Sequence, residues 1–165
     1  MPSPRSSRGE RFGVHRTVRS KALVLGLAIF ALAAMSAVAV AASTTLSTGK
    51  ASVNRKSRTV VVNSGGATLY TLSGESVGKV TRLKCVNSSC FNFWPPYKTT
   101  RTAKLTKTAG VKGTLGKLHR IKGKFYQVTL NGRPLYMFAF DKGKRGSAKG
   151  EGIKSFGGVW HVASP

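Results

Sequence analysis

The chain has 165 residues, of which 28 are Lys or Arg and only 4 are Asp or Glu, so its formal net charge is +24. One domain typically takes about 100–200 residues, so this length argues against a large multidomain enzyme. The scarcity of acids argues against calcium cages and paired-acid glycosidase centres. Because 41% of the residues are hydrophobic, the chain is still expected to fold.

The first 42 residues are predicted to be an export segment. Residues 1–21 hold six basic residues and one acidic residue, a net of +5, and residues 22–42 hold no charge. A basic stretch before an apolar run that ends in small residues is typical of an export signal. Two interpretations stay open: cleavage near Ala41 or Ala42, or a retained helical anchor long enough to cross a hydrocarbon core of about 30 Å. Both place the rest of the chain outside the cytoplasm, secreted or anchored to the cell membrane.

Residues 43–58 are rich in Ser, Thr and basic residues and have little apolar periodicity. This composition predicts a linker between the membrane and a folded domain over residues 59–165. The part after residue 42 holds 22 basic and 3 acidic residues, a net of +19. Most of the positive charge therefore belongs to the exported part.

The domain is predicted to be mainly all-β, preceded by the signal or anchor helix. Apolar and β-branched runs alternate with turn residues, and no helical period is visible after residue 42. Asn131-Gly132 separates two such runs, and this pair is a strong hairpin signal because both residues accept a positive φ. Lys122-Gly123 is expected to close another hairpin. The expected strands cover residues 59–63, 68–72, 119–121, 124–130, 133–140 and 157–162.

A shift of 66 residues aligns the sequence with itself, which predicts two pseudo-repeated β-hairpin units at about residues 60–98 and 126–165. Such a unit cannot bury its own apolar face alone, so the copies are expected to pack together. The matched positions are Gly66 with Gly132, Leu69 with Leu135, Tyr70 with Tyr136, Glu75 with Asp141, and Trp94 with Trp160.

The second copy contains Tyr136, Phe138 and Asp141 in the spacing Tyr-x-Phe-x-x-Asp. With its flanking segments, residues 131–134 and 157–160, it resembles a bacterial family of secreted repeats of unknown function, often described as predicted lipoproteins. The first copy is similar, but Leu72 and Glu75 stand in place of the aromatic residue and the Asp. The resemblance covers residues 60–165 and implies an envelope location and a small repeat fold. It supplies no activity, and no Cys follows the apolar run to carry a lipid.

Cys85 and Cys90 are separated by four residues in a chain sent to an oxidising compartment, so a local disulfide is the default expectation. The spacing is not the Cys-x-x-Cys of redox motifs. A zinc site needs about four ligands, and His119 and His161 show no metal-ligand spacing. We therefore expect no metal and no cofactor.

Seven motif positions are candidates for facing a ligand, although use in turns and core is the competing interpretation. A catalytic role is not expected, because no nucleophile and base accompany the carboxylates and no Gly-x-Ser-x-Gly elbow is present. The chain is therefore not expected to be an enzyme. The candidates are Tyr70, Glu75, Trp94, Tyr136, Phe138, Asp141 and Trp160.

A glycine-rich basic loop follows the second motif, but it lacks the pattern of a nucleotide-binding loop. Attraction of such a surface to polyanions is largely non-specific, so no specific nucleic acid is expected. We expect a non-catalytic envelope module that associates with anionic cell-wall polymers or the membrane surface. The alternative is a small-molecule or redox-cofactor site at the junction of the two repeats. The loop's cations are Lys142, Lys144, Arg145, Lys149 and Lys154.

Overall fold

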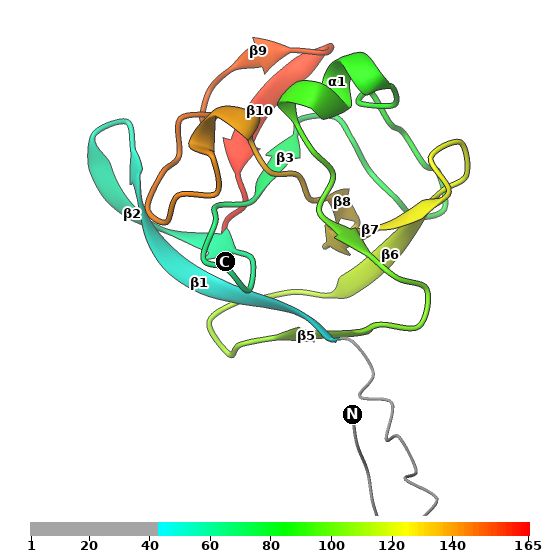
Figure 1. The fold of residues 1–165 in the computed structure, drawn as a ribbon, viewed down its shortest axis with the longest axis horizontal. Helices are drawn as coiled ribbons and strands as arrows, with labels where there is room; N and C mark the ends of the chain where they lie inside the picture. Colours follow the sequence, from blue (N-terminus) through cyan, green and yellow to red (C-terminus); the bar gives the residue numbers. More distant parts are fainter. Residues whose placement is uncertain (1–42) are drawn as a thin grey trace, which may run out of the picture. The chain divides into compact units, whose positions relative to one another are not determined.

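A computed structural model describes residues 43–165, and Figure 1 shows their strands running around a central core. The predicted signal or anchor over residues 1–42 lies outside the described residues. Within them the fold is mainly β, as predicted, with one short α-helix. The elements are β1 (Ser43–Val53), β2 (Lys56–Val62), β3 (Tyr70–Leu72), α1 (Ser88–Phe93), β4 (Lys98–Thr99), β5 (Lys104–Lys107), β6 (Leu115–Arg120), β7 (Phe125–Leu130), β8 (Arg133–Pro134), the 3-10 turn η1 (Ala139–Asp141), β9 (Lys154–Ser155) and β10 (Gly158–Val162).

The strands form three small sheets. In the first, β1 lies between β2, which is antiparallel to it, and β5, which is parallel. In the second, β10 lies between β3 and β9, both antiparallel. In the third, β7 lies between β4 and β6, and β8 also pairs with β7. Among residues 43–165, no helix has the length and apolar character needed to cross a membrane.

The linker predicted for residues 43–58 is wrong, because these residues form β1 and the start of β2. The periodicity is hidden because β1 buries opposite faces along its length. Leu46 packs into one core cluster, whereas Ala51 and Val53, on the other face, pack into another. The turn to β2 uses Asn54 and Arg55 at φ 51° and 63°, without the glycine that marks such turns.

The two hairpins predicted at Lys122-Gly123 and Asn131-Gly132 are present. β6 and β7 pair from Leu115–Leu130 to Arg120–Phe125. Asn131 and Gly132 then turn the chain with φ of 51° and 70°. A Cβ on Gly132 would lie 2.7 Å from the Val77 carbonyl oxygen, so this turn requires glycine for space as well as for φ. The strand predicted over residues 133–140 is too long, because β8 has two residues and the segment ends in η1.

The short helix α1 escaped sequence analysis because six residues are too few for a helical period. Its cap is nevertheless a sequence feature: the Asn87 side chain accepts the Cys90 backbone N–H at 3.1 Å. Cys90 is fully buried and forms the predicted disulfide with Cys85, across 5.5 Å between Cα atoms. The disulfide therefore fixes α1 to the chain that follows the first motif.

Candidate functional site

The two motif copies meet at their tyrosines. The backbone N–H of Tyr70 donates to the Tyr136 carbonyl at 2.8 Å, and that of Tyr136 donates to the Tyr70 carbonyl at 2.9 Å. On their other sides, Tyr70 pairs with Val162 and Tyr136 pairs with Pro96. Because Pro96 and Val162 are themselves 66 residues apart, the contacts repeat with the two copies exchanged.

The carboxylates are exchanged between the copies as well. The Tyr70 hydroxyl donates to Oδ2 of Asp141 at 2.5 Å, and the Tyr136 hydroxyl donates to Oε2 of Glu75 at 2.9 Å. Each tyrosine therefore binds the acid of the other copy, five residues after the other tyrosine. All four side chains are buried. Glu75 and Asp141 therefore link the two copies by hydrogen bonds.

The second oxygen of each carboxylate accepts hydrogen bonds from a loop that follows it in the chain. Glu75 Oε1 accepts the backbone N–H groups of Lys84 and Cys85 at 2.7 and 2.8 Å. Asp141 Oδ1 accepts the Ser147 hydroxyl at 2.5 Å and the Lys149 N–H at 3.1 Å. Buried carboxylates are stable when such donors surround them. Both oxygens of each carboxylate therefore accept hydrogen bonds from the protein, and the two acids bind different tyrosines.

Burial raises the pKa of Tyr70 far above its usual value, and the hydrogen bond to Asp141 and its charge raise it further. Burial likewise raises the pKa of Tyr136, with the Glu75 charge adding to the rise and the Arg120 charge opposing it. Both phenols therefore keep their protons and act as hydrogen-bond donors. Neither can serve as a general base at physiological pH.

Arg120 breaks the symmetry between the two sites. Its guanidinium is buried and donates to Gln127 Oε1 at 2.7 Å, to the Cys85 carbonyl at 3.0 Å and to the Tyr136 hydroxyl at 2.6 Å. The Tyr136 hydroxyl thus bridges the buried cation Arg120 to the buried anion Glu75. At the other site the Tyr70 hydroxyl accepts only a long bond, 3.4 Å, from the Gly150 N–H.

The tryptophans of the repeat stack in the centre of the junction. Trp94 and Trp160 lie 3.8 Å apart between ring centroids and are nearly parallel, at 5°. Tyr70 meets Trp94 edge-on at 5.4 Å, and Tyr136 meets Trp160 edge-on at 5.0 Å. Phe138 stacks on the outer face of this cluster, 4.3 Å from Trp94. Rings this close leave no room for a ligand between them.

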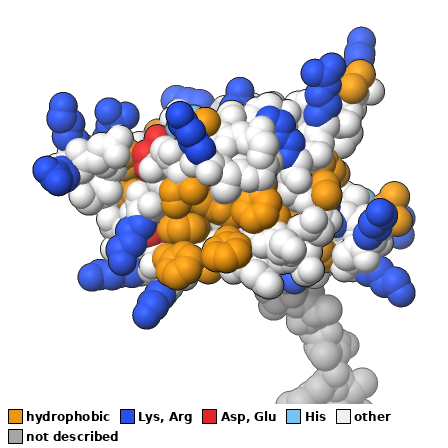
Figure 2. Space-filling view, turned by 90° about the horizontal axis from the view of Figure 1, so that it is seen from above, with side chains coloured by type: hydrophobic (Ala, Val, Ile, Leu, Met, Phe, Trp, Pro, Cys, Tyr) orange, Lys and Arg blue, Asp and Glu red, His pale blue; other side chains and the backbone are white. Residues whose placement is uncertain are grey.

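An apolar groove, here called the aromatic groove, opens at the edge of this cluster with a volume of about 320 Å³. Phe93 and Phe140 form its most exposed part, with 47% and 56% of their surface accessible, and their rings stack at 6.2 Å. Figure 2 looks onto the end of the domain where α1 and β9 lie and shows hydrophobic side chains gathered there with Lys and Arg around them. The groove is lined by Phe93, Trp94, Phe138, Phe140, Ile153, Ser155 and Phe156.

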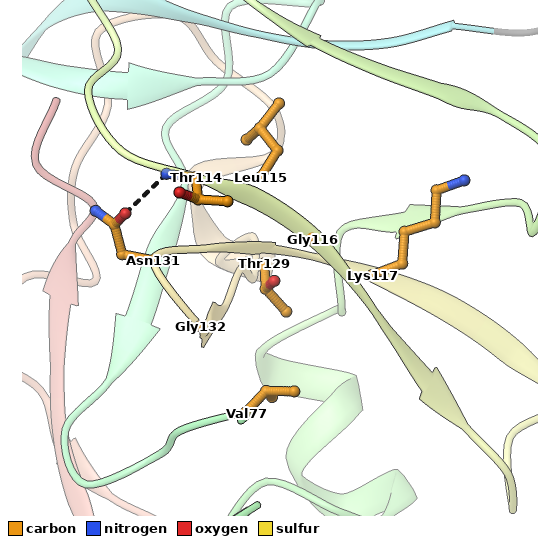
Figure 3. A pocket seen from close by; sticks show the side chains of 8 residues that line it. All are labelled: Val77, Thr114, Leu115, Gly116, Lys117, Thr129, Asn131 and Gly132. Carbon is orange, nitrogen blue, oxygen red and sulfur yellow. Dashed lines mark hydrogen bonds between the residues drawn. The ribbon is translucent and has the colours of Figure 1, made fainter. Parts of the chain in front are cut away.

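A second cavity, of about 590 Å³, lies beside the Asn131-Gly132 turn. Figure 3 shows Val77 across from Thr114 and the Asn131 side chain accepting the Thr114 N–H, at 2.9 Å. No carboxylate, His or Cys lines it, and the amine of its one titratable residue, Lys117, donates to the backbone carbonyls of Arg101 and Ala103. Across residues 43–165, no group of three His, Cys, Asp or Glu side chains could hold a metal ion.

The basic loop after the second motif is wrapped around Asp141. Its cations, which are Lys142, Lys144, Arg145, Lys149 and Lys154, are all exposed. The Ser147 and Lys149 contacts with Asp141, together with a bond from the Ser52 N–H to the Gly146 carbonyl at 3.0 Å, fix the loop to the domain. The backbone of the loop is therefore held in place. Its contacts with Asp141 come from the Ser147 hydroxyl and the Lys149 backbone N–H, and not from the charged side chains.

Sequence reasoning missed Arg120 and the exposed pair Phe93 and Phe140. For Arg120 a signal existed: in a strand it shares a face with Leu118, two residues before, and an inward cation needs buried acceptors. No comparable signal marks the two phenylalanines, because their exposure depends on how α1 and η1 meet.

Comparison with known proteins confirms the resemblance for the second copy. Residues 122–164 match the family described as "Secreted repeat of unknown function". The match includes Tyr136, Phe138, Asp141 and Trp160, whereas the first copy lies outside it. No curated protein and no solved structure matches the chain. Residues 122–164 are therefore similar to a secreted repeat to which no specific activity is attached.

Proposed function

We propose that this domain is a non-catalytic module of the cell envelope that binds anionic cell-wall polymers through its basic surface. The observation that carries the proposal is that the described residues leave their surface cations without neutralising acids. Glu75 and Asp141 are buried, and Glu151 bonds to His161 at 3.0 Å and to the Val162 N–H at 2.7 Å. Of the 22 basic residues after residue 42, all but Arg120 and Lys117 are exposed.

The electrostatic consequence supports a polyanionic partner. A net charge of +19 makes the domain strongly positive as a whole, which favours attraction of anionic polymers and repulsion between copies of this chain. Such attraction acts over about 10 Å at 0.1 M salt and is weakened by higher ionic strength. Wall polymers outside the membrane are the partner that this location and charge favour.

A non-catalytic role is supported by the state of the polar groups at the repeat junction. The carboxylates accept hydrogen bonds at both oxygens, and the phenols keep their protons. The alternative of a small-molecule or redox-cofactor site would need space between the repeats. The 3.8 Å stack of Trp94 on Trp160 argues against that space at the junction itself.

Export of the domain is supported by the family description of its second copy as secreted. We infer that the basic and apolar N-terminal segment directs this export, whether it is then cleaved or retained as an anchor. The proposal concerns the domain after residue 42 and holds in both cases.

Retention on purified cell wall across a salt series tests the proposal. We expect retention to fall steeply as the salt concentration rises, because exposed charges are screened. Replacing the five basic-loop cations by Gln should weaken retention, and a matched control should replace five exposed cations elsewhere. Equal weakening in both would assign binding to total charge, and greater weakening in the first would assign it to the loop. Retention independent of salt would contradict the proposal. The control cations are Lys56, Arg58, Lys79, Lys122 and Lys124.

A further inference from the structure

We propose that the aromatic groove docks on the surface of an anionic lipid bilayer, with hydrocarbon chains against its rings and lipid head groups at the surrounding lysines. This site is separate from the wall-polymer proposal, because it depends on apolar contact at one end of the domain rather than on total charge.

The lining of the groove favours hydrocarbon over sugar. Six of its seven lining residues are apolar, and the polar one, Ser155, already accepts the Trp160 indole N–H at 3.0 Å. A sugar chain carries hydroxyls that need hydrogen-bonding partners when water is removed, and this groove offers almost none. Acyl chains carry no polar groups, so they fill such a site without that penalty.

The exposure of Phe93 and Phe140 also points to a partner. Burial of aromatic rings is favourable by roughly 25 cal/mol per Å², and clustered exposed rings on a soluble domain mark interaction sites. Each ring contacts the other and neither belongs to the buried core clusters. Phe93 and Phe140 therefore line the aromatic groove and are not members of the buried core clusters.

The positive charge around the groove favours a negatively charged partner. Lys142 follows Phe140 by two residues, and Lys154 lies between Ile153 and Ser155; both lysines are exposed. Figure 2 shows Lys and Arg side chains around the hydrophobic centre of this face. Two copies of the domain meeting through this face would bring like charges together, which opposes a dimer. An apolar layer covered by anionic head groups matches both the centre and the margin.

The groove and the start of β1 lie at opposite ends of the domain. In Figure 1, the start of β1 lies at the bottom, whereas α1 and β9 lie at the top. A probe placed in the groove therefore reports on contact at one end of the domain.

The test places a tryptophan in the groove of the full chain and asks whether lipid reaches it. Phe140→Trp is compared with Ile121→Trp, since Ile121 is an equally apolar residue, 77% exposed, at the turn between β6 and β7. Vesicles carry brominated acyl chains, which quench tryptophan only within the hydrocarbon. We expect anionic vesicles to quench the tryptophan at position 140 and not that at 121, after subtraction of the unsubstituted chain's signal. Equal quenching at both positions, or none at 140, would overturn the proposal.

Two further variants separate apolar from electrostatic contributions. Lys142→Gln with Lys154→Gln should lower partitioning of the Phe140→Trp probe into anionic vesicles about fivefold per lysine, as a contribution of about 1 kcal/mol each predicts. Phe93→Ser with Phe140→Ser leaves every charge in place. It should preserve retention on cell wall, and bilayer contact is then read from Ile153→Trp in the same chain, where quenching should be lost. Quenching that persists without the two rings would contradict bilayer docking through the aromatic groove. Wall retention of the unsubstituted chain that does not depend on salt would contradict only the wall-polymer proposal.

Discussion

Removing the hydroxyl of Tyr136 should destabilise the domain much more than removing that of Tyr70. In Tyr136→Phe the ring stays in place, but Glu75 loses a donor at 2.9 Å and Arg120 loses an acceptor at 2.6 Å. A hydrogen bond to a charged group contributes about 1.5–3 kcal/mol, so the loss of two should cost about 3–6 kcal/mol. In Tyr70→Phe only Asp141 loses a close partner, and a hydrogen bond to one charged group contributes about 1.5–3 kcal/mol.

Urea unfolding followed by the fluorescence of the buried tryptophans measures both losses. Tyr126→Phe is the matched control, because this half-buried ring stacks on exposed His119, and a change within about 0.5 kcal/mol is expected. Combining Tyr136→Phe with Arg120→Met should cost less than the two changes added, since both remove the same bridge. Equal losses for the two motif tyrosines, or strict additivity with Arg120→Met, would refute the bridging role of the hydroxyl.

Three other measurements follow from the same structure. The pKa values of Tyr70 and Tyr136 are raised on folding, so the unfolded chain releases these protons at a lower pH than the folded chain does. The free energy of unfolding should therefore stay constant below about pH 10 and fall above it by about 1.4 kcal/mol per pH unit for each tyrosine. Each Phe variant should reduce that slope in alkaline unfolding curves. Gly132→Ala should cost more than Gly143→Ala in thermal unfolding, since both have positive φ but only Gly132 faces a close carbonyl; equal costs would contradict this steric argument. Replacing both cysteines of the Cys85–Cys90 bridge by Ala should cost about 2 kcal/mol in urea unfolding, and an unchanged midpoint would contradict a stabilising role.

The sequence was sufficient for features with local signatures. The Asn131-Gly132 hairpin follows from two residues that accept positive φ, and the disulfide follows from short spacing and compartment. It misled at residues 43–58, where Leu46 and Val53 point into different clusters on opposite faces of one strand. A strand that changes its buried face loses the alternation by which strands are recognised.

The exchange of acids between copies could not be read from the 66-residue shift. The shift aligns Tyr70 with Tyr136 and Glu75 with Asp141, but it does not say whether each tyrosine binds the acid of its own copy or of the other. That choice follows from the antiparallel contact of the two tyrosine backbones, which is a long-range pairing. Arg120 lies between the copies, so no repeat argument could assign it to one site.

The exchange also explains the distribution of charge over the domain. Three carboxylates follow residue 42, and the two at the repeat positions are required inside, where Tyr70 and Tyr136 donate to them. If either acid moved to the surface to neutralise a lysine, the junction would lose its cross-copy bond and a loop anchor. Because the junction takes the acids, the outer surface keeps nearly all of the cations. The same residues that hold the repeats together therefore leave the domain positive toward any partner.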